Sequence, residues 1–264
     1  MSYEKLFDAT VCTESAKAWR ASGKKAVGTV CCHVPYEIIY AAGVLPVRLR
    51  ATGCVDSSDA ESWMSSFSCS YARSILQYLM NGTYELDGLI QTDGCMMPTR
   101  IFDNWEHVSK KQGKDQFCYQ IGAPRITKDI TIKYYKNELQ GLADALSKLS
   151  GTAVTDAGLK AAVEKYNEIR ELVAQLNELR KAEKPVVSGA EALAIMIKFG
   201  DYTPDEYIAL LKEFLADAKN RKPIEGRARL MVIGSALDNP DYLKVIEEKG
   251  GLIVAEDNCF GERN

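Results

Sequence analysis

The sequence lacks the short motifs that most directly mark a metal or nucleotide site. Its eight cysteines include no CxxC pair, so neither a zinc finger nor a ferredoxin-type run is supported. It also has no glycine-rich phosphate loop and no serine-centred nucleophile elbow. These absences argue against a P-loop nucleotide hydrolase and against a serine hydrolase of the α/β class.

Positive charge and long apolar runs are scarce as well. The formal net charge is −3 and the pI is near 5.6, which argues against a nucleic-acid partner or an anionic membrane surface. No run approaches the roughly 18 apolar residues of a membrane helix, and the N-terminus lacks a signal-peptide layout. We therefore expect a cytoplasmic protein without nucleic-acid or membrane partners, whose irregularly spaced cysteines are core residues or metal ligands rather than disulfides.

The stretch 27–50, VGTVCCHVPYEIIYAAGVLPVRLR, organises the first part of the chain. Residues 27–30 predict a buried strand that ends at Cys31 and Cys32, because the following Pro35 cannot continue a central strand. Pro35 is instead typical of a first helical turn, and the helix would close at Gly43 before a second strand over 45–49. Strand, helix and strand form the unit of a parallel sheet, whose ligands bind beyond the carboxyl ends of the strands, where Cys31 and Cys32 fall.

The remaining pattern divides the chain into three segments. Helical spacing, strand-like runs and breakers predict the following elements: helices over 5–22, 69–80, 99–108, 158–181, 190–199, 204–220 and 241–249; strands over 86–90, 116–121, 227–234 and 251–255; and a loop over 51–66. We predict a Rossmann-like parallel α/β domain over 1–129, a helical segment over 130–223 and a partial second α/β domain over 224–264. Two strands and one helix do not make a stable covered sheet, so this last piece either packs on another domain or chain or belongs to a shortened form of a longer protein.

Two further cysteines also follow strands. Cys95 follows the strand at 86–90, and Cys259 follows the strand at 251–255. Because Cys31 and Cys95 lie beyond strands of the same sheet, their side chains can converge, although packing in the core is an equal alternative from spacing alone. A thiolate-rich site without a histidine in its pattern favours iron–sulfur over zinc. We expect the other cysteines to be packed: Cys12, Cys54, Cys69 and Cys118.

A cysteine nucleophile is the competing chemical interpretation. His33 adjoins the cysteine pair and could activate a thiolate toward an acyl group. Neighbouring residues of an extended chain point to opposite sides, however, so sequence neighbours seldom form that hydrogen bond. His33 could instead donate a hydrogen bond to a cluster sulfur, and we expect His107 to lie on the surface.

Four stretches together resemble the 2-hydroxyacyl-CoA dehydratase and benzoyl-CoA reductase superfamily. They are CCHVPYEIIYAAGVLPVRL, LDGLIQTDGC followed by RIFDNW, the helical KYNEIRELVAQLNELRKAEKPVVSGAEAL, and GGLIVAEDNCFGER. The likeness spans nearly the whole chain. It is most specific in the first stretch, where cysteine, Val-Pro, glutamate and Ala-Ala-Gly keep their order.

The resemblance implies an iron–sulfur subunit that works as a pair, either with a paralogous second subunit or as a homodimer. It implies a [4Fe–4S] cluster on three cysteines with one iron open, or in a related branch a double-cubane [8Fe–9S] cluster. An ATP-dependent activator protein would supply one low-potential electron. In the dehydratases that electron makes a ketyl radical of the acyl-CoA substrate, which permits loss of the 2-hydroxyl group, and in the reductases it attacks an aromatic ring.

The resemblance also assigns residues. Cys31 matches the first cluster cysteine, with Cys32 an extra thiol beside it, and Cys95 matches the second. Glu37 would lie near the open iron as a catalytic residue. Family members commonly have aspartate after the second cysteine, whereas this chain has two methionines, and they continue beyond residue 264. The third ligand is therefore either Cys259 or a residue beyond this chain's end.

The leading prediction is thus a 2-hydroxyacyl-CoA dehydratase-like lyase subunit. The alternatives are a subunit of a benzoyl-CoA reductase or a double-cubane reductase and, from another class, a cluster-free structural or assembly paralogue. No basic cluster marks a CoA site, for which Arg48, Arg50 and Arg100 are the candidates.

Overall fold

The computed structural model describes residues 2–263, which fall into two compact units. The first comprises residues 12–164, and the second comprises the N-terminal residues up to Val11 together with the chain from Lys165 onward. The three segments expected from the sequence, with boundaries at 129/130 and 223/224, were divided by a change in secondary-structure pattern. The two units are instead defined by which residues contact one another, so the two divisions differ.

The first unit is built on a four-stranded parallel sheet. Its strands are β1 (Lys25–Thr29), β2 (Val44–Arg48), β3 (Gly88–Thr92) and β4 (Phe117–Ile121), in the spatial order β2-β1-β3-β4. This confirms the parallel α/β fold predicted from the strand–helix–strand pattern. The chain moves outward from β1 to β2 and then returns to the other side of β1 with β3. The order therefore reverses between β1 and β3, and at such a reversal the loops after the two strands leave a crevice at their carboxyl ends.

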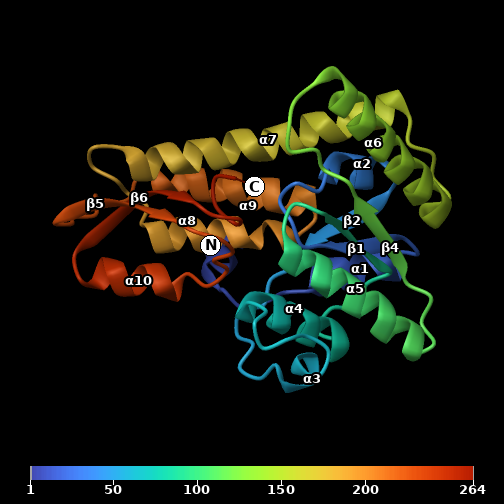
Figure 1. The fold of residues 1–264 in the computed structure, drawn as a ribbon. Helices are drawn as coiled ribbons and strands as arrows, with labels where there is room; N and C mark the ends of the chain where they lie inside the picture. Colours follow the sequence, from blue (N-terminus) through green and yellow to red (C-terminus); the bar gives the residue numbers. More distant parts are fainter. Residues whose placement is uncertain (1, 264) are drawn as a thin grey trace. The chain divides into compact units, whose positions relative to one another are not determined.

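Helices cover both faces of this sheet (Figure 1). The helices α2 (Tyr36–Ala41) and α6 (Asp129–Ser150) lie on one side, and α4 (Ser70–Met80) and α5 (Met96–Lys111) lie on the other. The apolar face between the sheet, α2 and α6 forms a continuous buried core: Val27, Val34, Ile38, Ile39, Ala42, Val44, Ile90, Ile121, Leu142, Ala143 and Leu146. Burial of both faces explains why the strands read as apolar runs rather than alternating patterns.

The single helix predicted over 5–22 is wrong. The chain forms a short 3-10 helix η1 (Ser2–Phe7), then an irregular stretch, then α1 (Glu14–Ala21). The hydroxyl of Tyr3 donates a 2.6 Å hydrogen bond to Asp217, and Leu6 is fully buried. Tertiary contacts therefore hold η1 in the second unit, which outweighs the local helical pattern that would continue into α1.

The second unit combines a helical layer with a small parallel sheet. Its helices are α7 (Asp156–Lys181, which begins in the first unit), α8 (Gly189–Ile197), η2 (Lys198–Gly200), α9 (Pro204–Ala218) and α10 (Asp241–Glu248), and its strands are β5 (Ala228–Ile233) and β6 (Gly251–Asp257). As the sequence predicts, Thr203 and Glu206 form a capping box at the start of α9. The α8 helix is buried on nearly all sides and packs against β6 and α10.

Strand β5 is exposed along most of its length. Met231 is 56% exposed and Ile233 is 70% exposed, and Tyr242 and Val245 of α10 are also open to solvent. Parallel strands are normally covered on both faces. Exposed apolar residues on such a strand are therefore typical of a surface that packs against another protein segment or a partner protein.

Asp87 ties the amino ends of β1 and β3 together. Its carboxylate accepts hydrogen bonds from the Ala26 N–H at 3.0 Å, Arg20 Nε at 3.0 Å and Lys25 Nζ at 3.1 Å. Burial acts to raise the pKa of Asp87, but the Ala26 N–H and the two cations outweigh it and hold the pKa below its usual range. A carboxyl group with a lowered pKa in the folded state stabilises the fold above its unfolded pKa and loses that contribution as the pH falls.

We expect Asp87→Asn to lower the free energy of unfolding by about 1–3 kcal/mol at pH 7, because hydrogen bonds to a charged group are lost. The difference from the unsubstituted protein should shrink as the pH falls below about 4, because Asp87 is then protonated first in the unfolded state and, at lower pH, in the folded state as well. Urea unfolding followed by tryptophan fluorescence measures this, since all three tryptophans lie in residues 12–164. The control Glu85→Gln removes a 3.8 Å contact of an exposed carboxylate to Arg20 and should change stability by less than about 0.5 kcal/mol. An equal loss in both variants at every pH would contradict the assignment.

Candidate functional site

The reversal of strand order brings two of the predicted cysteines to one edge of the first unit. Cys31 follows β1 by two residues, and Cys95 follows β3 by three. Since β1 and β3 are neighbours and parallel, both cysteines lie beyond the carboxyl ends of the two strands between which the order reverses. Cys31 is half-buried, whereas Cys95 is exposed at the N-cap of α5.

The two loops that carry these cysteines adjoin each other. A Cβ atom at Gly94 would lie 3.3 Å from Nδ1 of His33 and 3.5 Å from Oγ1 of Thr92. His33 is two residues after Cys31, and Gly94 immediately precedes Cys95. The hydroxyl of Thr92 also lies close enough to Cys31 to favour the thiolate form of that cysteine. The loop after β1 therefore contacts the loop after β3, as the parallel sheet predicted.

The surroundings of Cys31 stabilise a negative charge on its sulfur. The pKa of the Cys31 thiol is lowered to about 5, chiefly because the Cys32 thiol donates toward it, although burial opposes this shift. The Thr92 hydroxyl, the backbone N–H of His33 and the buried guanidinium of Arg48 lower it further. At neutral pH Cys31 is thus a thiolate, the form that binds metal.

Two buried polar atoms beside this edge have no hydrogen-bond partner among the described residues. They are Oγ1 of Thr92, whose approach to Cys31 does not complete a hydrogen bond, and Oε1 of Gln91. Both side chains are fully buried at the carboxyl end of β3. Buried polar groups are nearly always satisfied, so the unpaired Thr92 hydroxyl beside the Cys31 thiolate indicates that a polar group belongs there. A sulfide-containing cluster requires thiolates and accepts hydrogen bonds, which fits Cys31 and the Thr92 hydroxyl. The amide oxygen of Gln91 can only accept a hydrogen bond and adds nothing to this fit.

Arg48, the last residue of β2, has a role that the sequence pattern did not indicate. Arg48 pairs in register with Thr29 and is 2% exposed, and Arg50 is fully buried with its Nη1 donating to Thr52. Neither side chain is open to a nucleotide phosphate, and the third candidate, Arg100, is paired with Asp103 at 3.3 Å. The signal that could have identified Arg48 as part of the thiolate site is its position as a charged residue in an otherwise apolar strand.

The other predicted site residues lie at different places. Glu37 is in the first turn of α2 and is partly exposed, six residues after Cys31. His33 contributes its backbone N–H to Cys31, and the hydrogen bond from its imidazole to a cluster sulfur stays a prediction. Cys259 follows β6 in the second unit and is half-buried.

The three predicted cluster cysteines do not form a ready-made ligand set. Within residues 2–263, no three cysteine, histidine, aspartate or glutamate side chains gather closely enough to hold a metal ion. The set of Cys31, Cys95 and Cys259 therefore stays a prediction.

The acidic net charge and the absence of a long apolar run are the basis for expecting no membrane partner. Over the same described range, no helix is both long and apolar enough to cross a bilayer.

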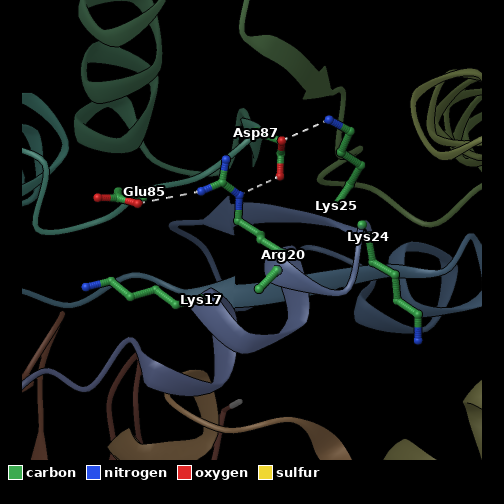
Figure 2. A pocket seen from close by; sticks show the side chains of 8 residues that line it. Lys17, Arg20, Lys24, Lys25, Glu85 and Asp87 are labelled. Atoms are coloured by element: carbon green, nitrogen blue, oxygen red, sulfur yellow. Dashed lines mark hydrogen bonds and ion pairs between the residues drawn. The ribbon is translucent and has the colours of Figure 1, made fainter.

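A positively charged pocket lies at the opposite end of the first sheet (Figure 2). It has a volume of about 390 Å³ and is lined by cations that include Lys17, Arg20, Lys24 and Lys25. Arg20 and Lys25 are already bound to Asp87, and the ammonium groups of Lys17 and Lys24 point away from that pair in different directions. The pocket does not focus its charge on one point and is not a convincing phosphate site.

The first unit is of the parallel α/β class, whose members bind their ligands at the carboxyl edge of the sheet where the strand order reverses. The chain belongs to the family "2-hydroxyglutaryl-CoA dehydratase, D-component", whose model matches residues 31–264. This match confirms the superfamily inferred from the sequence.

Three relatives illustrate the range of that family. The chain is 28% identical to a benzoyl-CoA reductase subunit of Thauera aromatica, 25% identical to the (R)-phenyllactyl-CoA dehydratase beta subunit of Clostridium sporogenes, and 28% identical to the beta subunit of (R)-2-hydroxyglutaryl-CoA dehydratase of Acidaminococcus fermentans. The matches cover 94%, 94% and 93% of this chain and 66%, 66% and 65% of the relatives. The chain thus spans about two thirds of the length of the curated relatives it matches.

We expect Cys31 to be alkylated by iodoacetamide in the iron-free protein with a half-maximal rate near pH 5, because its thiolate is stabilised. An ordinary thiol reaches half-maximum near about pH 8.5. Cys118 is the matched control, because burial first and Glu106 second raise its pKa to about 11. Peptide mass spectrometry across pH 4–10 measures both residues, and Thr92→Val should move the Cys31 profile to higher pH. A Cys31 profile centred near pH 8.5 would contradict the thiolate assignment.

Proposed function

We propose that this chain is an iron–sulfur subunit of a 2-hydroxyacyl-CoA dehydratase, with Cys31 and Cys95 as two ligands of a [4Fe–4S] cluster. The third ligand is Cys259 or a residue outside this sequence. One observation carries the proposal: two strand-end cysteines, on loops that contact each other, lie where the strand order of a parallel sheet reverses. The family match and its dehydratase relatives support the same assignment.

The protein's own groups prepare this edge for a cluster. Cys31 offers a thiolate without losing a proton at neutral pH, and the His33 N–H and the Thr92 hydroxyl are placed to donate toward sulfur. Donors to sulfur and nearby positive charge raise the potential of an iron–sulfur site, and burial limits the access of water. Arg48 supplies that charge from β2.

When bound, the cluster supplies one-electron chemistry to an acyl-CoA thioester. Glu37, in the first turn of α2, is the residue we assign to the reacting group, where a carboxylate can accept or donate a proton. An ATP-dependent activator protein and a paralogous subunit or second copy complete the assembly in this proposal. The relatives' names as subunits support a partner of that kind.

The alternative within the same site is a reductase subunit, which would hold either a single cubane or the double-cubane [8Fe–9S] cluster. The 28% identity to the benzoyl-CoA reductase subunit favours this alternative as much as the dehydratase matches favour the first. Turnover of 2-hydroxyacyl-CoA against aromatic acyl-CoA, with the activator present, separates the two.

The test is anaerobic purification and reconstitution with iron and sulfide, followed by iron and sulfide analysis and low-temperature EPR. We expect Cys31→Ser and Cys95→Ser each to lose most of the bound iron, because each removes a thiolate ligand. Cys118→Ser is the matched control: it also removes a half-buried thiol of the first unit, but this thiol lies within β4, and iron should be unchanged.

Absence of iron from the reconstituted unsubstituted protein, with all eight thiols freely titratable, would overturn the cluster and favour the structural or assembly paralogue. Equal iron in the Cys31→Ser and Cys118→Ser proteins would overturn the ligand assignment while leaving a cluster elsewhere.

A further inference from the structure

Exposed apolar side chains of the first unit are concentrated at one edge of its sheet. Among the described residues 12–164, all but one of the large apolar side chains that are open to solvent lie on the segments that follow β2, β3 or β4. Phe67, after β2, is 97% exposed, and Ile130, after β4, is 75% exposed. Apolar side chains that gather on one surface, rather than scatter, are typical of a site that binds another protein.

Two of these segments carry opposite charge. The first, which we call the acidic segment, is residues 51–69, which follow β2 and include the short helix α3 (Ser58–Glu61). The second, the basic segment, is residues 122–136, which follow β4 and include the start of α6. The acidic segment has three acidic residues and no basic one, whereas the basic segment has four basic residues and one acidic one. All eight of these residues are exposed.

Little of this charge is neutralised within the chain. Among the described residues, Glu61 is the one carboxylate of the acidic segment with a cationic neighbour, Arg73 of α4 at 3.7 Å. Over the same part of the chain, no basic side chain of the basic segment lies within ion-pair distance of a carboxylate: these are Arg125, Lys128, Lys133 and Lys136. Each segment therefore presents charge that an oppositely charged surface can pair with.

The two segments leave the sheet at opposite ends of one edge. Strands β2 and β4 are the outer strands in the order β2-β1-β3-β4, and all four strands are parallel. The segments that follow β2 and β4 therefore start from the same edge, one at each end of it. In Figure 1, α3 and α6 accordingly lie at opposite ends of the unit.

This arrangement is complementary to itself. A two-fold axis at the middle of the edge places the acidic segment of one copy against the basic segment of the other, and symmetry forms the same contact a second time. An acidic partner of another kind would be repelled at one end of the edge, and a basic partner at the other. Both segments also bring exposed apolar side chains to the contact, and these supply the buried area that exposed ion pairs alone do not. They are Val55 and Phe67 in the acidic segment and Ile126 and Ile130 in the basic segment.

We propose that two copies of this chain associate through the carboxyl edge of the first sheet, with the acidic segment of each copy bound to the basic segment of the other. This names the surface and the partner where the proposed function leaves a choice between a second copy and a paralogous subunit, and in that respect it rests on the proposed function. The association itself needs no cluster, so iron-free protein serves for the test.

The test measures the mass of the iron-free full chain in solution, by analytical ultracentrifugation over a dilution series, beside two charge-reversal variants. One variant carries Asp56→Lys with Glu61→Lys, and the other carries Arg125→Glu with Lys133→Glu. The unsubstituted chain should sediment at twice its mass of 29.2 kDa, and its dissociation constant should rise with salt, which screens exposed charges. Each variant alone should raise the dissociation constant by about tenfold or more, because like charges then face each other at both contacts.

An equimolar mixture of the two variants is the decisive sample. In a mixed pair, one contact has both of its charges reversed and the other contact is native, so opposite charges meet at both ends of the edge. The mixture should therefore associate as tightly as the unsubstituted chain, although neither variant does so alone. A variant that had lost its fold would not recover in this way, so the mixture separates a lost contact from a lost fold.

Two further proteins separate apolar contact from charge, and position from charge. Phe67→Ser should weaken the pair by about tenfold and keep its salt dependence, because it removes apolar contact and changes no charge. Lys114→Glu with Lys160→Glu is the matched control. It reverses two exposed charges of the same unit, one before β4 and one on α7, and should leave the dissociation constant unchanged.

A chain that stays monomeric throughout the dilution series, or that pairs only with a paralogous subunit, would overturn the inference. The same holds for a dimer that both charge-reversal variants leave intact, and for a mixture that does not recover. None of these results bears on the cluster, which iron and sulfide analysis of the unsubstituted protein tests separately.

Discussion

The reversal of strand order between β1 and β3 is the constraint on which the first unit depends. Parallel strands end at the same edge, and the connections from β1 and from β3 leave to opposite sides of the sheet. The loops after the two strands therefore lie beside each other at one edge. Cys31 and Cys95 are on those loops, so the topology alone brings two cysteines that are 64 positions apart in the sequence to the same edge of the sheet.

Electrostatics give that edge of the sheet its chemical character. Burial by itself would make Cys31 a neutral, inert thiol, as it does for Cys118 on β4. The neighbouring Cys32 thiol, the Thr92 hydroxyl and the charge of Arg48 reverse the outcome at Cys31. Cys31 and Cys118 belong to the same unit and are both partly buried, but only Cys31 has hydrogen-bond donors and a buried cation nearby. The position of a cysteine at the strand end therefore decides its pKa more than its burial does.

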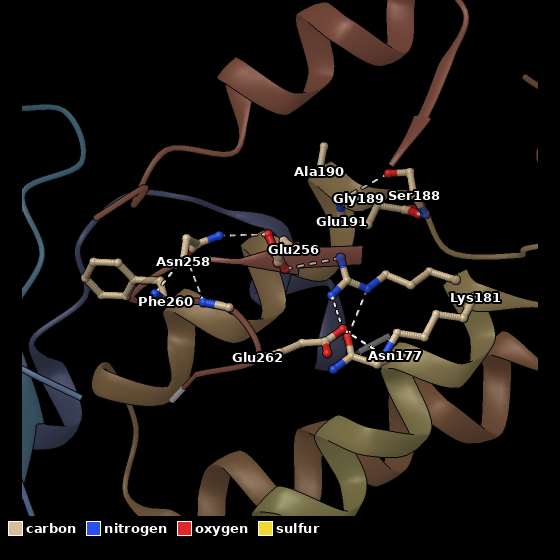
Figure 3. Close-up of polar contacts among 12 residues, drawn as sticks. Asn177, Lys181, Ser188, Gly189, Ala190, Glu191, Glu256, Asn258, Phe260 and Glu262 are labelled. Carbon is tan, nitrogen blue, oxygen red and sulfur yellow. Dashed lines mark hydrogen bonds and ion pairs between the residues drawn. The ribbon is translucent and has the colours of Figure 1, made fainter. Parts of the chain in front are cut away.

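The second unit repeats the same principle in a smaller form. Its parallel strands β5 and β6 also end beside a cysteine, and residues 258–262 around it are held by hydrogen bonds to Asn258 and by ion pairs of Arg180 on α7 (Figure 3). Sequence pattern found the strand and the cysteine here, because apolar runs and their breakers are local signals. It could not find Arg180, which is 79 positions before Cys259 and is one of many charged residues on a helix.

The sequence by itself determined the parallel α/β class, the strand-end positions of three cysteines, the caps of α9 and the family, because each depends on residues close together in the chain or on a likeness along it. Only the tertiary structure decided that η1 belongs to the second unit and that Arg48 and Arg50 are buried rather than open to a phosphate. It also decided that the Thr92 hydroxyl lies close to Cys31. Those facts depend on contacts between distant segments, whose free energy no local pattern expresses.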